Sequence, residues 1–338
     1  MPRPSVFVTR LLPGGAIEFL KHHAAVRVWR EEEPPLAEEL VQQAARSDAI
    51  LSLLTDRIDA NLLSNSPRLA IVSNMATGFD NVDIGAASAN NVLVTRTPGV
   101  LSETTAEFTI ALLFATSRRI VEGDRSVRNG QWKTWGPNVL LGVDLAGATL
   151  GIIGMGGVGE AVARRGRALG MRVKYYSRTR KRDLEKELRI SYSSFTSLLE
   201  RADFVSLHAP LTAETKHLIG KAELDLMKPS AVLINTARGP LVNQSALYTA
   251  LSRQRIAAAA IDVSDPEPMP PDDPLLTLPN VIVTPHIASA STATRSRMAM
   301  LAAENLVQAL QGKLPKHTVN RNIARQWRER VRGRFTSS

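Results

Sequence analysis

A glycine-rich segment constrains the fold of this chain more than any other feature of its sequence. Residues 154–159 read Gly-Met-Gly-Gly-Val-Gly, and Ala163 follows. The apolar run Thr149–Ile153 comes directly before them, and the Ala- and Val-rich run Gly157–Leu169 continues from them. A Gly-x-Gly-x-x-Gly pattern that leaves a strand and opens a helix is typical of a βαβ unit that binds a dinucleotide. We therefore predict a parallel sheet with a cofactor at this point.

Each glycine of the motif has a physical role in such a site. Gly154 makes the tight turn after the strand, Gly156 lets the backbone approach a pyrophosphate, and Gly159 lets helix and strand pack closely. The first turn of the helix offers N–H groups and a partial positive charge to the phosphates. The expected cofactor contacts in this segment are Gly154, Met155, Gly156, Gly157, Val158 and Gly159.

The next strand-like run indicates which cofactor is preferred. A site for NAD usually has Asp or Glu at the end of this strand, where the carboxylate binds the ribose 2′-OH. Here the run Arg172–Tyr176 is followed by Ser177, Arg178, Thr179 and Arg180. Guanidinium groups suit bidentate contact with a phosphate, and no carboxylate is present to repel the 2′-phosphate. We predict NADP(H) as the preferred cofactor, with use of NAD(H) as well if this loop is only solvated.

The rest of the chain alternates short apolar runs with amphipathic stretches, which predicts an α/β fold of two doubly wound parallel-sheet domains. Residues 101–287 are expected to form one domain, and residues 1–100 with 288–338 the other. One long helix is expected from Ser102 to about Arg128. The predicted strands are Val6–Thr9, Ala49–Leu53, Ala70–Ser73, Val92–Val94, Thr149–Ile153, Arg172–Tyr176, Asp203–Leu207, Ala231–Asn235, Ala257–Asp262 and Val281–Thr284.

Composition excludes several classes of protein. The chain has no cysteine, which excludes disulfides and thiolate metal sites and fits a reducing compartment. No apolar run approaches the roughly 20 residues needed to span a bilayer, and residues 1–10 contain no apolar stretch typical of a signal peptide. We expect a cytoplasmic protein with no membrane partner and no metal site.

The net charge of +10 raises the question of a nucleic-acid partner. Residues 313–338 contain eight Lys or Arg and one acid, Glu329, so this segment alone carries +7. Terminal segments of this kind are usually solvated and partly frayed, and no zinc-finger spacing or RNA-binding aromatic motif accompanies it. We expect a solvated tail, and a nucleic-acid or acidic partner is the less favoured interpretation.

Candidate catalytic groups follow the predicted strands of the second domain. His208, Arg238 and His286 each come just after an apolar strand-like run, and Glu267 lies among prolines after another. Ligands of open α/β sheets bind at the carboxyl ends of the strands. Taken singly, each histidine can be structural and each charge can be solvated. Together, a cation, a carboxylate and an imidazole can bind an acid, polarise its carbonyl and protonate the oxygen as a hydride arrives.

Motifs of both domains occur in one order along the chain. A single motif of this kind is only suggestive, whereas the ordered set is specific. The motifs are Gly78-Phe79-Asp80-Asn81-Val82-Asp83, Thr97-Pro98-Gly99-Val100, the glycine-rich segment, His208-Ala209-Pro210-Leu211-Thr212, Asn235-Thr236-Ala237-Arg238-Gly239, Asp262 to Pro268, and Pro285-His286.

This ordered set resembles the D-2-hydroxyacid dehydrogenase family, and most closely its glyoxylate/hydroxypyruvate reductase branch. The resemblance implies a Rossmann-type coenzyme domain inserted into a flavodoxin-like substrate domain, in a homodimer joined through the coenzyme domains. It also implies reduction of a small 2-oxo acid, glyoxylate or hydroxypyruvate, to the D-2-hydroxy acid. Arg238 matches the arginine that binds the substrate carboxylate and carbonyl, His286 the proton donor, and Glu267 the carboxylate that orients His286.

The resemblance implies further contacts. Backbone N–H groups of Ala76, Thr77 and Gly78 would bind the substrate carboxylate, and Leu53 would form an apolar wall. Trp135 is a candidate substrate contact in a neighbouring subunit, or else packs in the dimer interface. The remaining cofactor contacts would be Thr105, His208, Ala209, Pro210, Thr236, Ala237, Arg238, Asp262, His286 and Ala288.

Two positions depart from the family pattern, and two alternatives stay open. Gly157 stands where an Arg is frequent, and Ser264 stands where a Phe is common. A 2-ketogluconate reductase or a phosphoglycerate dehydrogenase is the alternative enzyme, although 338 residues leave no room for the regulatory domain of many phosphoglycerate dehydrogenases. A cofactor-sensing scaffold, similar to the family's transcriptional corepressors, is the alternative of another class, and only the basic tail favours it.

Overall fold

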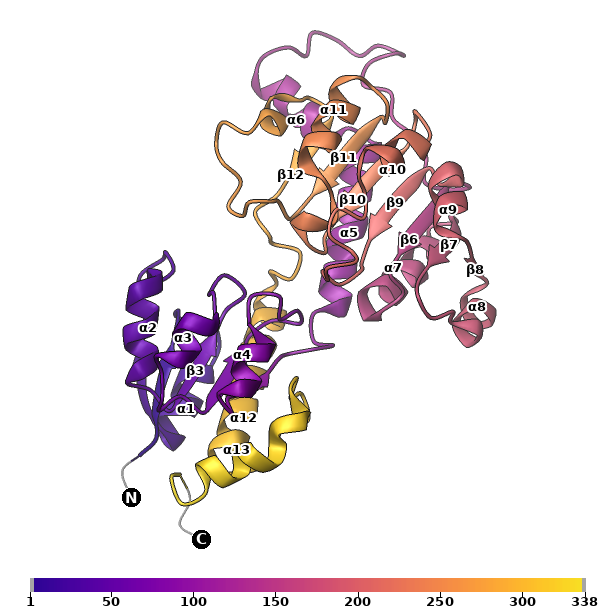
Figure 1. Ribbon diagram of the computed structural model, residues 1–338. Helices are drawn as coiled ribbons and strands as arrows, with labels where there is room; N and C mark the ends of the chain where they lie inside the picture. The colour runs from indigo at the N-terminus through magenta and orange to yellow at the C-terminus, as the bar shows by residue number, and fades with distance from the viewer. Residues whose placement is uncertain (1–2, 336–338) are drawn as a thin grey trace. The chain divides into compact units, whose positions relative to one another are not determined.

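The computed structural model describes residues 3–335 and divides the chain into two compact units (Figure 1). Unit 1 contains the residues up to 101 and those from 290 onward, and unit 2 contains residues 102–289. Each unit is built on one parallel sheet with helices, so the predicted fold class is confirmed. Among residues 3–335, no helix combines the length and the apolar character that crossing a membrane requires.

Unit 1 contains a five-stranded parallel sheet in the order β2-β1-β3-β4-β5. This is the flavodoxin-like order, in which the chain reverses direction across the sheet between β1 and β3. The edge strand β2 was not predicted, because its side chains alternate between exposed and half-buried and form no apolar run. The strands are β1 (Ser5–Val8), β2 (Ala25–Val28), β3 (Ala49–Ser52), β4 (Ile71–Asn74) and β5 (Leu93–Thr95).

Successive side chains of the central strands enter apolar clusters on opposite faces of this sheet, because the side chains of a strand alternate in direction. In β1, Val6 and Val8 pack with Leu306 of α12, whereas Phe7 packs with Leu40 of α2. The α-helices of unit 1 are α1 (Ala16–His23), α2 (Ala37–Ala45), α3 (Ala60–Ser64), α4 (Ile84–Ala89), α12 (Thr292–Leu310) and α13 (Ala324–Val331).

The C-terminal segment is packed against unit 1, so the expectation of a solvated, frayed tail is wrong for residues 313–335. Figure 1 shows α12 and α13, in gold and yellow, beside the indigo N-terminal elements of the same unit. Trp327 has 0% of its surface exposed, and its Nε1 donates to the Ala70 carbonyl at 3.1 Å. Arg334 donates to Asp48 at 3.0 Å, which neutralises part of the charge. The expectation for residues 336–338 falls outside the described residues.

Unit 2 contains a seven-stranded parallel sheet in the order β12-β11-β10-β9-β6-β7-β8. The chain starts in the middle at β6, extends to β8 on one side, and returns to β9 on the other. This is the Rossmann arrangement with its switch point between β6 and β9. The strands are β6 (Thr149–Ile153), β7 (Arg172–Tyr176), β8 (Ser191–Tyr192), β9 (Phe204–Leu207), β10 (Val232–Asn235), β11 (Ala258–Ile261) and β12 (Val281–Val283).

The single long helix predicted from Ser102 is two helices in the structure. Arg119 has a φ of 50°, a left-handed conformation that ends one helix before the next begins. The α-helices of unit 2 are α5 (Ser102–Ser117), α6 (Ile120–Arg128), α7 (Gly157–Ala168), α8 (Arg182–Leu188), α9 (Phe195–Arg201), α10 (Lys221–Leu226) and α11 (Gln244–Ser252). Short 3-10 helices are η1 (Gly239–Leu241) and η2 (Pro274–Thr277) in unit 2 and η3 (Arg321–Ile323) in unit 1.

Candidate active site

The glycine-rich loop lies at the switch point of the unit 2 sheet, between β6 and α7. Gly154 has a φ of +97°, and a Cβ built there would lie 2.5 Å from the carbonyl of His208, which follows β9. A Cβ on Gly159 would lie 2.1 Å from the Gly154 carbonyl oxygen. A Cβ on Gly156, in contrast, would have no heavy atom within 4 Å. The loop is therefore closely packed on the protein side and open at Gly156, which fits a pyrophosphate there.

The basic loop after β7 contains an ion pair that the sequence did not indicate. Both Nε and Nη2 of Arg180 donate to the Glu185 carboxylate at 2.8 Å, and the Tyr175 hydroxyl donates to the same group at 2.7 Å. These hydrogen bonds, that from Arg180 foremost, lower the pKa of Glu185 to about 2. Arg178 is exposed, whereas the Ser177 hydroxyl donates to the Thr179 carbonyl at 2.6 Å. In the structure Arg180 is therefore paired with Glu185, whereas the side chain of Arg178 is exposed on the surface.

The imidazole of His286 and the carboxylate of Glu267 form a close pair. Nδ1 of His286 lies 2.7 Å from Oε1 of Glu267, and the two side chains are 21% and 32% exposed. An ionised carboxylate only accepts hydrogen bonds, so Nδ1 is the donor and carries a proton. The contact with Glu267 therefore fixes the orientation of the imidazole ring.

Asp262 fixes the backbone that carries His286. Its side chain is fully buried at the end of β11, and Oδ1 accepts from the Thr284 hydroxyl at 2.6 Å and from the Ile287 N–H at 2.9 Å. Oδ2 accepts from the Ala288 N–H at 2.7 Å, and the Asp262 carbonyl accepts from the His286 N–H at 2.8 Å. His286 has a φ of 54°, a conformation that needs such support. The sequence assigned Asp262 to the cofactor and missed this positioning role.

Arg238 lies in a loop that is held from two sides. The buried Asn235, at the end of β10, donates to the Arg238 carbonyl at 2.9 Å and accepts from the Ala237 N–H at 3.0 Å. A Cβ on Gly239 would lie 1.9 Å from the carbonyl oxygen of Ser264. The loop after β10 therefore packs directly on the loop after β11 that contains Glu267. The structure brings these two loops together at one edge of the sheet.

His208 differs from His286 in its surroundings. Its Nε2 lies 2.9 Å from the Ser206 hydroxyl, and its backbone N–H donates to the Ile153 carbonyl at 2.7 Å. Burial lowers its pKa to about 3, so the imidazole stays neutral at pH 7. A neutral, half-buried histidine against the glycine-rich loop fits the structural role expected for it and not that of a proton donor.

The other predicted cofactor contacts of unit 2 are spread over several elements. Thr105 is buried on α5, and Ala288 is buried after β12. Thr236 is buried beside Thr109, with the two hydroxyl oxygens 2.9 Å apart. Ala209 and Pro210 follow His208, next to the glycine-rich loop, while Ala237 precedes Arg238. Trp135 is 80% exposed in the segment between α6 and β6.

The predicted substrate contacts of unit 1 follow two neighbouring strands. Leu53 comes after β3, and Ala76, Thr77 and Gly78 come after β4, which pairs with β3 in parallel. Carboxyl ends of parallel strands meet at one edge, so both segments lie at the same edge of this sheet. The Ala76 N–H donates to the Asn74 carbonyl at 2.8 Å. Of the three predicted N–H donors, that of Ala76 is therefore used within the loop.

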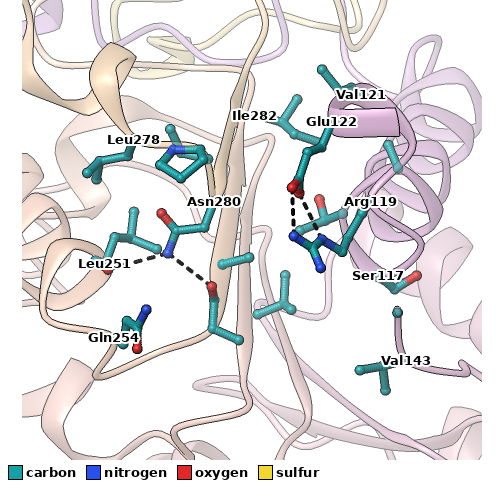
Figure 2. A pocket seen from close by; sticks show the side chains of 18 of the residues that line it. Ser117, Arg119, Val121, Glu122, Val143, Leu251, Gln254, Leu278, Asn280 and Ile282 are labelled. Carbon is teal, nitrogen blue, oxygen red and sulfur yellow. Dashed lines mark hydrogen bonds and ion pairs between the residues drawn. The ribbon is translucent and has the colours of Figure 1, made fainter. Parts of the chain in front are cut away.

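A cavity of about 610 Å³ lies at the opposite edge of the unit 2 sheet, near the amino ends of β10, β11 and β12. Figure 2 shows Asn280, Leu251 and Leu278 on one side of it and the ion pair of Arg119 with Glu122 on the other. Ligands of open α/β sheets bind at carboxyl ends. This cavity is therefore separate from the His286 site.

Comparisons with known proteins agree with this geometry. The family described as D-isomer specific 2-hydroxyacid dehydrogenase, NAD binding domain, matches residues 110–288. A glyoxylate reductase of Aeropyrum pernix is 52% identical over 329 residues, which are 96% of this chain and 98% of the relative.

Solved structures of proteins named as glyoxylate reductases also match nearly the whole of this chain. A glyoxylate reductase from Paecilomyes thermophila has 30% identity and a TM-score of 0.84 and covers 95% of this chain and 100% of its own. An NADPH-dependent glyoxylate/hydroxypyruvate reductase from Sinorhizobium meliloti, in complex with NADP and malonate, has 31% identity and a TM-score of 0.81, over 94% of this chain and 97% of its own. The resemblance inferred from the ordered motifs is confirmed: the chain belongs to the D-isomer specific 2-hydroxyacid dehydrogenase family and is an NAD(P)-dependent dehydrogenase.

Proposed function

We propose that this dehydrogenase reduces a small 2-oxo acid, glyoxylate or hydroxypyruvate, to the D-2-hydroxy acid and prefers NADP(H) as its cofactor. The observation that carries the proposal is the 2.7 Å contact of His286 Nδ1 with Glu267 Oε1, together with the packing of the Glu267 loop against the loop of Arg238. The names of the relatives from Aeropyrum pernix and Sinorhizobium meliloti support the choice of substrates.

The three side chains have distinct tasks in this reaction. The Arg238 guanidinium binds the substrate carboxylate and polarises the carbonyl. Glu267 accepts from Nδ1 of His286, which orients the ring so that Nε2–H is directed toward the substrate. The cofactor, when bound, supplies the hydride to the carbonyl carbon. Nε2 of His286 gives its proton to the carbonyl oxygen as that oxygen gains negative charge, and the neutral imidazole then takes up a proton from solvent.

The cofactor would be held by the glycine-rich loop and by the residues that follow β7, β9, β10, β11 and β12. The open space at Gly156 supports the pyrophosphate position. Arg178, exposed beside Ser177 and Thr179, is the proposed contact for a 2′-phosphate. Arg180, held by Glu185, contributes positive charge and shapes the loop.

Unit 1 is proposed to be the substrate domain. Leu53 would supply an apolar wall, and the loop that contains Ala76, Thr77 and Gly78 would receive the carboxylate. A reducing, cytoplasmic location fits a chain without cysteine.

We also propose a homodimer formed through unit 2. The segment from α6 to β6 exposes seven large apolar side chains, each with more than half of its surface accessible, and no other segment of residues 3–335 exposes as many. A second copy of this segment is the proposed occupant of the cavity at Asn280, and Trp135 would then reach the neighbouring subunit. The seven side chains are Ile120, Val127, Trp132, Trp135, Val139, Leu141 and Val143.

Initial rates of the purified protein test the proposed reaction. Oxidation of NADPH and of NADH is followed with glyoxylate, hydroxypyruvate, pyruvate and 2-ketogluconate as substrates. We expect fast NADPH oxidation with glyoxylate or hydroxypyruvate and slower oxidation of NADH. Fast turnover of 2-ketogluconate alone would replace the proposed substrate, and a higher kcat/KM for NADH would refute the cofactor preference.

A further inference from the structure

Three consecutive carbonyl groups of the loop after β4 are each held by a donor of unit 1. The Ala76 carbonyl accepts from the Thr97 N–H at 2.8 Å. The Thr77 carbonyl accepts from Nη1 of Arg96 at 3.0 Å, and the Gly78 carbonyl accepts from Nδ2 of Asn74 at 3.2 Å. The orientation of three successive peptide planes is therefore fixed by contacts outside the loop.

The anchored carbonyls determine where the N–H groups of the same peptides point. In a trans peptide the C=O of one residue and the N–H of the next lie on opposite sides of the chain. The N–H groups of Thr77, Gly78 and Phe79 therefore each point away from the donor that anchors their own peptide. Within residues 3–335, none of these three N–H groups makes a hydrogen bond, and their residues are half-buried. Successive N–H groups that are fixed and unpaired form a binding place for an anion.

Of the three anchoring donors, the Thr97 N–H and the Asn74 amide are uncharged, whereas the Arg96 guanidinium is charged. Arg96 is itself held in place. Its N–H donates to the His317 carbonyl at 3.2 Å, and its carbonyl accepts from Nδ2 of Asn305 at 3.1 Å. Its guanidinium carbon lies 5.6 Å from the ring centroid of Phe79. Arg96 therefore contacts the loop at two points, the Thr77 carbonyl and the Phe79 ring.

The charge around Arg96 is also positive. The pKa of His317 is lowered by partial burial first, and then by the positive charges of Lys316, Arg96 and Arg321. These groups include no carboxylate, and Asp80, which follows Phe79 in the chain, is exposed to solvent. Both the fixed N–H groups and the field of the neighbouring cations favour a carboxylate.

We infer that Arg96 is a positioning residue for the substrate carboxylate: it orients the Thr77–Gly78 peptide so that the Gly78 N–H faces the anion. Arg96 was not among the residues that the sequence indicated. The inference rests on the proposed function, because that function supplies the carboxylate, and it adds a residue that sets affinity for the acid without contacting the cofactor.

The test compares Arg96→Met, which removes both donor and charge, with Arg96→Gln, which keeps an N–H donor. Arg330→Met is the matched control, because Arg330 is also half-buried in unit 1 and donates to two carbonyls, those of Asn90 and Pro67, away from the loop. Binding of oxamate, a 2-oxo acid isostere that accepts no hydride, is measured by calorimetry with NADPH present. KM values for glyoxylate and for NADPH are measured in parallel.

We expect Arg96→Met to raise the oxamate Kd and the glyoxylate KM about tenfold, the effect of one hydrogen bond, with the NADPH KM within about twofold of the wild type. Arg96→Gln should recover part of the loss, and Arg330→Met should leave the oxamate Kd unchanged. The thermal midpoint of each variant shows whether it is folded. If Arg96→Met does not fold, the oxamate Kd of Arg96→Gln is compared with that of Arg330→Met. A higher Kd for Arg96→Gln supports the inference.

An oxamate Kd that is the same in the wild type and in the folded Arg96 variants would overturn the inference, as would a wild type that binds no oxamate. Failure of the proposed function looks different. A wild type that reduces no 2-oxo acid, yet binds oxamate in a way that depends on Arg96, would refute the reaction and support the role of Arg96.

Discussion

At the residue scale, the site depends on a few polar groups whose surroundings decide what they can do. His286 and His208 illustrate this point, since both follow a strand of the same sheet. Both are half-buried, but His286 is paired with Glu267, whereas desolvation lowers the pKa of His208 to about 3. His208 therefore stays neutral near pH 7, whereas the contact with Glu267 orients the His286 ring.

Replacing His286 by Ala tests its role. Because general acid catalysis by a positioned side chain contributes about 10²–10⁴-fold, we expect kcat for glyoxylate reduction to fall by at least a factor of about 100. NADPH binding, followed by its fluorescence, should change little. His208→Asn serves as the control for a structural histidine, with a smaller loss of kcat. Normal turnover of His286→Ala would remove this residue from the mechanism.

A second substitution, Arg178→Asp, tests cofactor selection. Arg178 is exposed, while Arg180 is bound to Glu185. A carboxylate at position 178 would repel a 2′-phosphate, so the ratio of kcat/KM for NADPH to that for NADH should fall about tenfold or more. Arg182→Asp, at the exposed start of α8, is the control variant, which makes the same change of charge at a nearby position. An unaltered ratio in Arg178→Asp would show that this loop does not select the phosphate.

At the scale of elements, strand ends position the proposed catalytic groups, and buried contacts hold the loops that follow these strands. Asn235, Asp262 and Gly239 fix the loops that contain Arg238 and His286, the residues that we propose to carry the reaction. In unit 1 the helix α13 has a comparable supporting role, because its Trp327 is fully buried against the sheet.

The contribution of α13 is measured by Trp327→Ala. Loss of a large buried aromatic side chain typically costs about 3–5 kcal/mol, because a cavity remains and apolar contacts are lost. We expect the free energy of unfolding from urea titration to fall by this amount. Arg325→Ala, whose side chain is 89% exposed on the same helix, should change it by less than about 0.5 kcal/mol. Equal stabilities of the two variants would contradict the packing of α13.

At the scale of the whole molecule, the segment from α6 to β6 exposes more large apolar side chains than any other segment of residues 3–335. Its apolar side chains are a large exposed surface of the kind that marks an interface. This segment also contributes Leu141 and Val143 to the lining of the cavity at Asn280, so the segment and the cavity form one continuous surface, which suits an isologous contact between two copies.

Sedimentation of Leu141→Asp tests the homodimer. Leu141 is 64% exposed and lines the cavity, so a charge there should shift the protein from twice the chain mass toward the chain mass. Leu36→Asp is the control, because Leu36 is 80% exposed and precedes α2, where Asp is a favourable N-cap. A wild type that sediments as a monomer at micromolar concentration would refute the proposal.

The sequence by itself determined the fold class, most of the strands and the strand-end positions of Arg238, Glu267 and His286. It could do so because apolar periodicity and glycine spacing are local signals, and because parallel strands place their carboxyl ends at one edge whatever the loops do.

Only the tertiary structure decided which partners the polar groups take. The ion pair of Arg180 with Glu185 joins a strand end to the next helix, Trp327 reaches Ala70 from the far end of the chain, and Arg96 meets the Thr77 carbonyl. Each contact depends on how separate segments pack in three dimensions, and a side chain's choice among several available carbonyls and carboxylates leaves no periodic pattern in the sequence.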